Sequence, residues 1–185
     1  HYSGMVTRIG PDMGGNAIEV DPAAMTVTID GVVEKVDVCN VIPGQRAGQI
    51  AFAAGITDGN WAPVSAYDMS SKVDPNITVL GDAAAQGAMP KSGFSANSQA
   101  KVAANAIVAA LTGSRAFPAR YSNTCWSLLD TDDGIKVGAT YEASDTGIVS
   151  IDSFVSQVGE TADVRAATYR ESLDWYRAIT SDMFV

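Results

Sequence analysis

The chain has 185 residues, of which 46% are hydrophobic and 18% charged, and its formal net charge at pH 7 is −9. This length and apolar content are enough for a sizeable core in one or two domains. The acidic balance disfavours a nucleic-acid partner. No apolar run approaches the roughly 18 to 20 residues that a membrane-spanning helix needs. We therefore expect a soluble globular chain that neither binds nucleic acid nor spans a membrane.

The first forty residues carry signals of β-structure. The dipeptide Asp30-Gly31 is typical of a tight hairpin turn between two strands. A more continuously apolar run follows, which predicts a further, buried strand that Pro43 and Gly44 end. The predicted strands cover residues 17–20, 26–29, 32–36 and 37–42. A short helix over residues 47–54 that Gly55 ends, and a loop over residues 61–64, are predicted next.

The most informative segment, residues 77–113, is typical of a strand, a turn and a helix. Ile77, Val79 and Leu80 predict a buried strand whose carboxyl end delivers Gly81 and Asp82. In open α/β sheets ligands bind beyond this end of the strands. The Asp82 carboxylate would accept hydrogen bonds from sugar-like hydroxyls, and Gly81 would let a ligand approach the backbone.

The helix that follows is predicted to begin after Ser92 or Ser95 and to end at Gly113. Its first amides and positive dipole end would face an electron-rich group such as one edge of a flavin ring. Lys91 would add a mobile positive charge there. Ordinary strand-turn-helix units share this pattern, so spacing alone leaves a flavin open. The predicted packing face comprises Ala100, Ala103, Ala104, Ile107, Val108 and Leu111.

After Gly113 we expect strands over residues 135–142 and 147–151 and a long helix over residues 160–183. One face of that helix is apolar, and Trp175 lies off it, where a Trp most simply covers another surface. The face comprises Tyr169, Leu173, Tyr176, Ile179 and Met183.

The two cysteines have different contexts. Cys39 lies in an apolar run and is predicted to be a core residue, whereas Cys125 lies in a loop-like Ser-Asn-Thr-Cys-Trp sequence. A disulfide between them is also possible in an oxidising compartment.

Residues 77–113, together with the sequences VIPGQRAG at 41–48, YSNTC at 121–125 and WY at 175–176, resemble the flavoprotein subunit of flavocytochrome c sulfide dehydrogenases. This family is related to sulfide:quinone oxidoreductases and to glutathione reductase-like flavoproteins. The resemblance implies an α/β fold, α+β in the last third, from the carboxyl-terminal portion of a two-dinucleotide-domain flavoprotein. Residues 1–42 would be the tail of the second, pyridine-nucleotide-like domain and residues 43–115 the second segment of the FAD-binding domain. Residues 116–185 would be the carboxyl-terminal sulfide dehydrogenase flavoprotein domain, an interface domain.

The resemblance also implies the chemistry. FAD would be the cofactor, no metal is implied, and Cys125 would be the second member of a redox-active pair that sulfide attacks. The flavin would take two electrons and pass them singly to a c-type cytochrome in the periplasm. The cofactor contacts implied are Gly81, Asp82, Pro90, Lys91, Ser92, Gly93 and Trp175.

The sequence contains no G-x-G-x-x-G motif for the ADP half of FAD and begins at His1 without an initiator Met. We therefore expect the carboxyl-terminal part of a longer enzyme, inactive by itself. Two alternatives remain: a non-enzymatic module that binds another protein through the long helix and an exposed Trp175, and an enzyme like the sulfide:quinone oxidoreductases. The second is disfavoured because no amphipathic basic membrane anchor is present at the carboxyl end.

Overall fold

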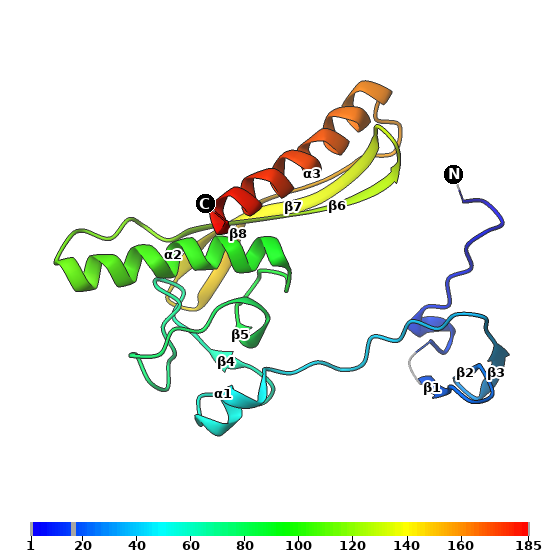
Figure 1. The fold of residues 1–185 in the computed structure, drawn as a ribbon, viewed down its shortest axis with the longest axis horizontal. Coiled ribbons are helices and arrows are strands. Elements are labelled where there is room, and N and C mark those ends of the chain that lie inside the picture. The colour runs from blue at the N-terminus through cyan, green and yellow to red at the C-terminus, as the bar shows by residue number, and fades with distance from the viewer. Residues whose placement is uncertain (1, 16–17, 185) are drawn as a thin grey trace. The chain divides into compact units, whose positions relative to one another are not determined.

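A computed structural model describes residues 2–15 and 18–184 and divides the chain into two compact units, His1–Gly44 and Gln45–Val185. Each unit is described by itself. Helices and sheets alternate along the chain, which confirms the predicted α/β character (Figure 1). Within the described ranges, none of the helices combines the length and apolar character needed to cross a bilayer.

The first unit contains a short 3-10 helix, η1 (Pro11–Met13), and an antiparallel sheet in the order β1 (Ile18–Asp21), β2 (Thr26–Ile29), β3 (Val32–Lys35). The hairpin predicted at Asp30-Gly31 is confirmed, because both residues have positive φ angles of 48° and 83° as a type I′ turn requires. Residue 17, at the start of the first predicted strand, lies outside the described residues.

The strand predicted over residues 37–42 is wrong. This segment has no regular structure, and the side chains of Val38 and Ile42 are 85% and 79% exposed. Cys39 is likewise exposed and is not a core residue. An apolar run becomes a buried strand only where a neighbouring strand accepts its backbone hydrogen bonds, and the sheet of this unit ends at β3.

The second unit begins with α1 (Gln49–Ala53), within the helix predicted over residues 47–54, and Gly55 ends it with φ 68°. The predicted loop over residues 61–64 contains β4 (Ala62–Pro63), which pairs in parallel with β5 (Ala84–Ala85). Gly81–Ala83 forms the 3-10 helix η2.

The buried strand predicted over residues 77–80 is wrong. Only Thr78 forms an isolated bridge, with Ser70, and Leu80 is exposed. The remaining backbone bonds of the segment go to the preceding loop, where the Val79 N–H donates to the Met69 carbonyl at 3.0 Å. Residues 77–80 therefore have an irregular backbone that is hydrogen-bonded to the loop around Met69.

Helix α2 (Gly93–Thr112) confirms the predicted caps: the Ser92 hydroxyl accepts the Ser95 N–H at 3.1 Å, and Gly113 has φ 68°. The predicted packing face is wrong in its outer half, because Ile107, Val108 and Leu111 are all exposed. The helix packs instead through smaller and polar side chains, which approach η2 and the sheet closely. The buried positions are Ser95, Gln99, Ala103 and Ala109.

The rest of the unit is an antiparallel meander of β6 (Arg120–Asp130), β7 (Asp133–Ser144) and β8 (Gly147–Val155). The sequence predicts β7 and β8 in part but misses β6, so Cys125 lies on a strand and not in a loop. One end of the sheet covers the main core. There Tyr121 of β6 and Tyr141 of β7, which lie opposite one another, pack with Met69 and Met89.

Helix α3 (Ala162–Met183) confirms the long predicted helix and runs along the sheet, in contact with β7 and β6 (Figure 1). Its predicted apolar face is only partly right, because Tyr169 and Ile179 are half-buried but the other three residues are exposed. Tyr176 and Met183 are 65% and 57% exposed, whereas Thr168 is buried and Trp175 is half-buried on the packing face. Small and polar groups pack here because Gly134 of β7 lets the backbone of α3 approach directly.

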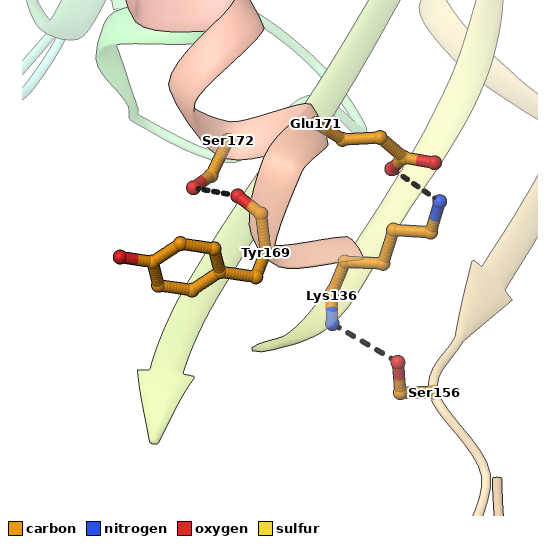
Figure 2. A network of polar contacts seen from close by, with 5 residues as sticks. All are labelled: Lys136, Ser156, Tyr169, Glu171 and Ser172. Carbon is orange, nitrogen blue, oxygen red and sulfur yellow. Dashed lines mark hydrogen bonds and ion pairs between the residues drawn. The ribbon is translucent and has the colours of Figure 1, made fainter. Parts of the chain in front are cut away.

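Polar contacts fasten α3 to the sheet. Lys136 of β7 lies 2.5 Å from the Glu171 carboxylate through its Nζ, and its backbone N–H donates to the Ser156 hydroxyl at 3.1 Å (Figure 2). Arg165 Nε donates to the Gly134 carbonyl at 3.1 Å. These contacts fix the helix on the sheet, and with it the side chains that α3 presents to the Cys125 side of β6.

Gly134→Ala is expected to destabilise the second unit by about 1–3 kcal/mol, the usual effect of overpacking. A Cβ at this position would lie 2.9 Å from the Tyr169 nitrogen and 3.0 Å from its Cα, so the backbone of α3 must shift. Urea unfolding followed by far-UV circular dichroism measures the change. Gly48→Ala is the matched control, because its Cβ would meet no atom within 4 Å; equal stability of the two variants would contradict the prediction.

Candidate functional site

An open pocket of about 380 Å³ lies where the start of α2, the middle of β6 and α3 meet. Four of the residues predicted from the sequence line it: Ser92, Gly93, Cys125 and Trp175. They come from three elements that are separate in the sequence. The structure therefore brings together the predicted helix start, the predicted redox cysteine and the predicted ring-contacting Trp.

The aromatic side chains of the pocket form one cluster. The rings of Phe94 and Trp175 are stacked, with centroids 5.4 Å apart and planes at 11°, and Trp126 lies 5.8 Å from Trp175. Trp126 Nε1 is buried without a hydrogen-bond partner among the described residues. Sequence reasoning did not select Phe94 or Trp126. Recognising residues 120–130 as a strand would have placed Trp126 at its middle, one residue after Cys125.

The amino terminus of α2 supplies polar character to an otherwise apolar wall. The Ser92 hydroxyl caps the Ser95 amide, while the N–H groups of Gly93 and Phe94 have no carbonyl partner within a helix that begins there. A Cβ at Gly93 would meet no atom within 4 Å, so the space in front of this first turn is open. Helix starts of this kind favour anionic or electron-rich groups.

Cys125 is exposed, and a buried amide lies next to its sulfur. Asn123 Nδ2 is 3.6 Å from the Cys125 Sγ, and Asn123 Oδ1 accepts hydrogen bonds from the hydroxyls of Ser92 at 2.6 Å and Ser95 at 3.2 Å. Burial, and to a smaller extent the charge of Cys125, raise the pKa of Tyr141 on the neighbouring strand. Cys39 and Cys125 are both free and exposed, and a disulfide between them stays a prediction because they lie in different units.

The other predicted contacts, Gly81, Asp82, Pro90 and Lys91, lie outside this pocket and are tied to one another. The Lys91 ammonium donates to the carbonyls of Asp82 at 2.7 Å and Ala84 at 2.8 Å and lies 3.6 Å from the centroid of the Trp61 ring. The prediction of a mobile charge is therefore wrong. Burial lowers the pKa of Lys91, and the nearby Asp82 opposes this shift.

Gly81 and Pro90 belong to a buried amide network that the sequence did not reveal. The Gly81 N–H donates to Gln99 Oε1 at 2.7 Å, Gln99 Nε2 donates to Gln86 Oε1 at 2.7 Å, and Gln86 Nε2 donates to the Pro90 carbonyl at 2.6 Å. Gly81 has φ 71°, which explains its identity through backbone conformation. The sequence did contain one signal for this network: Gln99 lies at a core-facing position of an alanine-rich helix.

Asp82 is exposed, and its carboxylate has no hydrogen-bond or ion-pair partner among the residues that the structure describes. It remains available to ligand hydroxyls, as the sequence predicts. The two groups of predicted residues are joined by the continuous backbone from Lys91 to Gly93, which leads from the η2 side to the start of α2.

A family model supplies the independent comparison. Residues 117–184 match the model described as flavocytochrome c sulphide dehydrogenase, flavin-binding. The carboxyl-terminal part of this chain is therefore similar to the flavin-binding domain of flavocytochrome c sulphide dehydrogenase. The match covers β6, β7, β8 and α3, and so includes Cys125 and Trp175. It confirms the predicted resemblance and the flavin cofactor for this part. The segment from Gly81 to Gly93 precedes the matched residues, and its contacts to a cofactor stay predictions, as do the predicted domain boundaries.

The residues present in the pocket fit the ring portion of FAD. Flavocytochrome c sulphide dehydrogenase domains bind a planar aromatic group, and the pocket offers aromatic walls, an orphaned buried N–H on Trp126 and the open first turn of α2. Ser92, Gly93 and Trp175 would hold the ring beside Cys125. Asp82 lies outside the pocket, and its contact with the hydroxyl-bearing part of the cofactor stays a prediction.

Proposed function

We propose that this chain provides the flavin-ring and redox-cysteine side of an FAD-dependent sulfide dehydrogenase. The observation that carries the proposal is the convergence of Cys125, Trp175 and the start of α2 on one pocket within and next to the flavin-binding domain. A cysteine, a planar-ring wall and a positive helix end are the parts that a thiol-to-flavin electron transfer requires.

Each residue has a role in this scheme. Hydrosulfide attacks one sulfur of a disulfide that Cys125 forms with a second cysteine, so a sulfur–sulfur bond forms as the old one breaks and a thiolate leaves. When bound, FAD accepts the electron pair and returns it one electron at a time. The start of α2 stabilises negative charge at the ring edge, and Trp175 and Phe94 exclude water from its face.

The electron acceptor and the compartment belong to the same proposal. A small c-type cytochrome in the periplasm would take the single electrons, and the acidic surface, with a net charge of −9, suits a basic partner. A quinone is the alternative acceptor. The alternative of a non-enzymatic interaction module loses its original basis, since Trp175 is stacked within the aromatic cluster, but the exposed Ile107, Val108 and Leu111 of α2 favour a docking surface.

Flavin binding tests the proposal directly. We expect riboflavin and FAD both to lose fluorescence on titration with the protein, because the proposed contacts are to the ring. Trp175→Leu should weaken both affinities about two- to tenfold, since an aromatic stacking contact contributes about 0.5–1.5 kcal/mol.

Phe117→Leu is the matched control for this titration, because Phe117 is an aromatic residue that is 77% exposed and lies outside the pocket. Its affinity for both flavins should equal that of the unchanged protein. Absence of quenching with both riboflavin and FAD would refute the proposal and favour the interaction module.

A further inference from the structure

Asn123 is a buried amide without a packing explanation for its polarity. It lies on β6 two residues before Cys125, so both side chains point to the same face of the sheet. The side chain is 3% exposed, in a position where an apolar residue would fill the space without needing hydrogen bonds. A buried amide of this kind needs hydrogen-bond partners for both its oxygen and its NH₂ group.

The hydroxyls on α2 determine which way this amide points. The oxygen Oδ1 accepts from Ser92 Oγ at 2.6 Å and from Ser95 Oγ at 3.2 Å. An amide has one acceptor end and one donor end. In the structure Oδ1 faces these two hydroxyls and the NH₂ group faces the other way, where it lies 3.6 Å from the Cys125 Sγ.

We propose that Asn123 is a positioning residue for Cys125: its amide, oriented by Ser92 and Ser95, presents an N–H to the Cys125 sulfur and favours the thiolate. The meaning of this contact for sulfide oxidation rests on the proposed function, but the contact itself does not depend on a flavin. The thiolate is the form of cysteine that attacks and leaves in thiol–disulfide exchange.

The surroundings leave few other groups to do this. No Asp, Glu, Lys, Arg or His lines the Cys125 pocket in the described ranges. The titratable groups that face it are Tyr176 from α3 and Tyr141 from β7, and burial raises the pKa of Tyr141. From α2 only the hydroxyls and the helix start face it, without an acidic residue in the first turn. The Asn123 amide is thus the directed donor to this sulfur.

Asn123→Leu and Asn123→Asp together test the proposal: leucine removes the donor that faces the sulfur without adding a charge, whereas the carboxylate keeps an acceptor for Ser92 and Ser95 but adds a negative charge beside the sulfur. The background is the full chain carrying Cys39→Ser, so that Cys125 is the single thiol. Iodoacetamide alkylation, which forms a thioether and releases iodide, is followed by mass spectrometry across pH without flavin. We expect about a tenfold lower rate at neutral pH, equivalent to about 1.4 kcal/mol, and a rate profile displaced to higher pH.

The controls separate orientation from general disturbance. In the Cys125→Ser background, Asn123→Asp should leave the alkylation of Cys39 unchanged. Ser95→Ala, which removes one of the two donors that orient the amide, should lower the Cys125 rate about two- to threefold, and it decides the matter if Asn123→Leu does not fold. A rate and pH profile within twofold of the parent in a folded Asn123→Leu protein would overturn the proposal, even if Asn123→Asp is slower. Because flavin is absent, this result is independent of flavin titration.

Discussion

Gln99→Leu is expected to destabilise the second unit by about 3 kcal/mol, since two buried polar groups lose their partners and each loss costs about 1–3 kcal/mol. The Gln99 side chain is fully buried and joins the Gly81 N–H to Gln86 Oε1. Leucine fills a similar volume but can neither accept from the first group nor donate to the second. Urea unfolding gives the free energy of unfolding.

The same substitution should also reach the cofactor. Without Gln99, the turn that carries Gly81 and Asp82 loses its attachment to α2, so we expect weaker binding of FAD and riboflavin alike, because both carry the ribityl hydroxyls assigned to Asp82. Ala104→Leu, an added leucine on the exposed side of the same helix, is the control and should change stability by less than about 0.5 kcal/mol. A Gln99→Leu protein as stable as this control would show that the network carries no net stability.

Cys125→Ser is expected to abolish sulfide-driven reduction of bound flavin. The substitution is made in a parent protein that holds FAD and both cysteines of the pair. Serine keeps the size of the side chain but forms neither a disulfide nor a persulfide. Loss of the visible absorbance of oxidised flavin after addition of sulfide, under anaerobic conditions, measures the reaction. Flavin itself should remain bound, because the ring contacts are made by other residues.

Cys39→Ser is the matched control for Cys125→Ser. Cys39 is exposed in the first unit, on a segment without regular structure, and no predicted site residue lies there. We expect the Cys39→Ser protein to reduce its flavin at the unchanged rate. Retention of full reduction in Cys125→Ser would remove this residue from the mechanism. Loss of reduction in Cys39→Ser would show that the reaction depends on Cys39.

The sequence predicted elements whose signals are local. Asp30-Gly31 specifies its hairpin through positive φ angles, and Ser92 and Gly113 bound α2 through cap geometry. Helix α3 follows from its length and period. These features are encoded within a few residues and need no knowledge of what packs against them.

Features that depend on distant partners were missed. Strand β6 carries polar residues on both faces, because Asn123 faces α2 and Ser122 donates its N–H to Ser98 at the edge of the sheet. No alternation of hydrophobicity marks such a strand. The predicted packing face of α3 was partly wrong for a related reason: Gly134 lets small side chains pack there, so the larger apolar residues are not the buried ones.

The site shows the same division. Cys125, Trp175, Ser92 and Gly93 converge as the resemblance implied, but the position of Lys91 could not be read from the sequence. Its ammonium is held by backbone carbonyls and by the Trp61 ring, partners that only the folded turn brings together. The sequence alone does not distinguish a lysine that stabilises a turn from a lysine that is available to bind a ligand.

The connectivity of the second unit has a consequence for how the pocket comes to exist. Strands β6, β7 and β8 and helix α3 are consecutive in the chain, and such local structures form early and fast. Helix α2 reaches them through the Ser92–Asn123 bond between residues 31 positions apart. The pocket therefore exists only when α2 is docked on the meander, and the chemical reactivity of Cys125 would report whether that docking is intact.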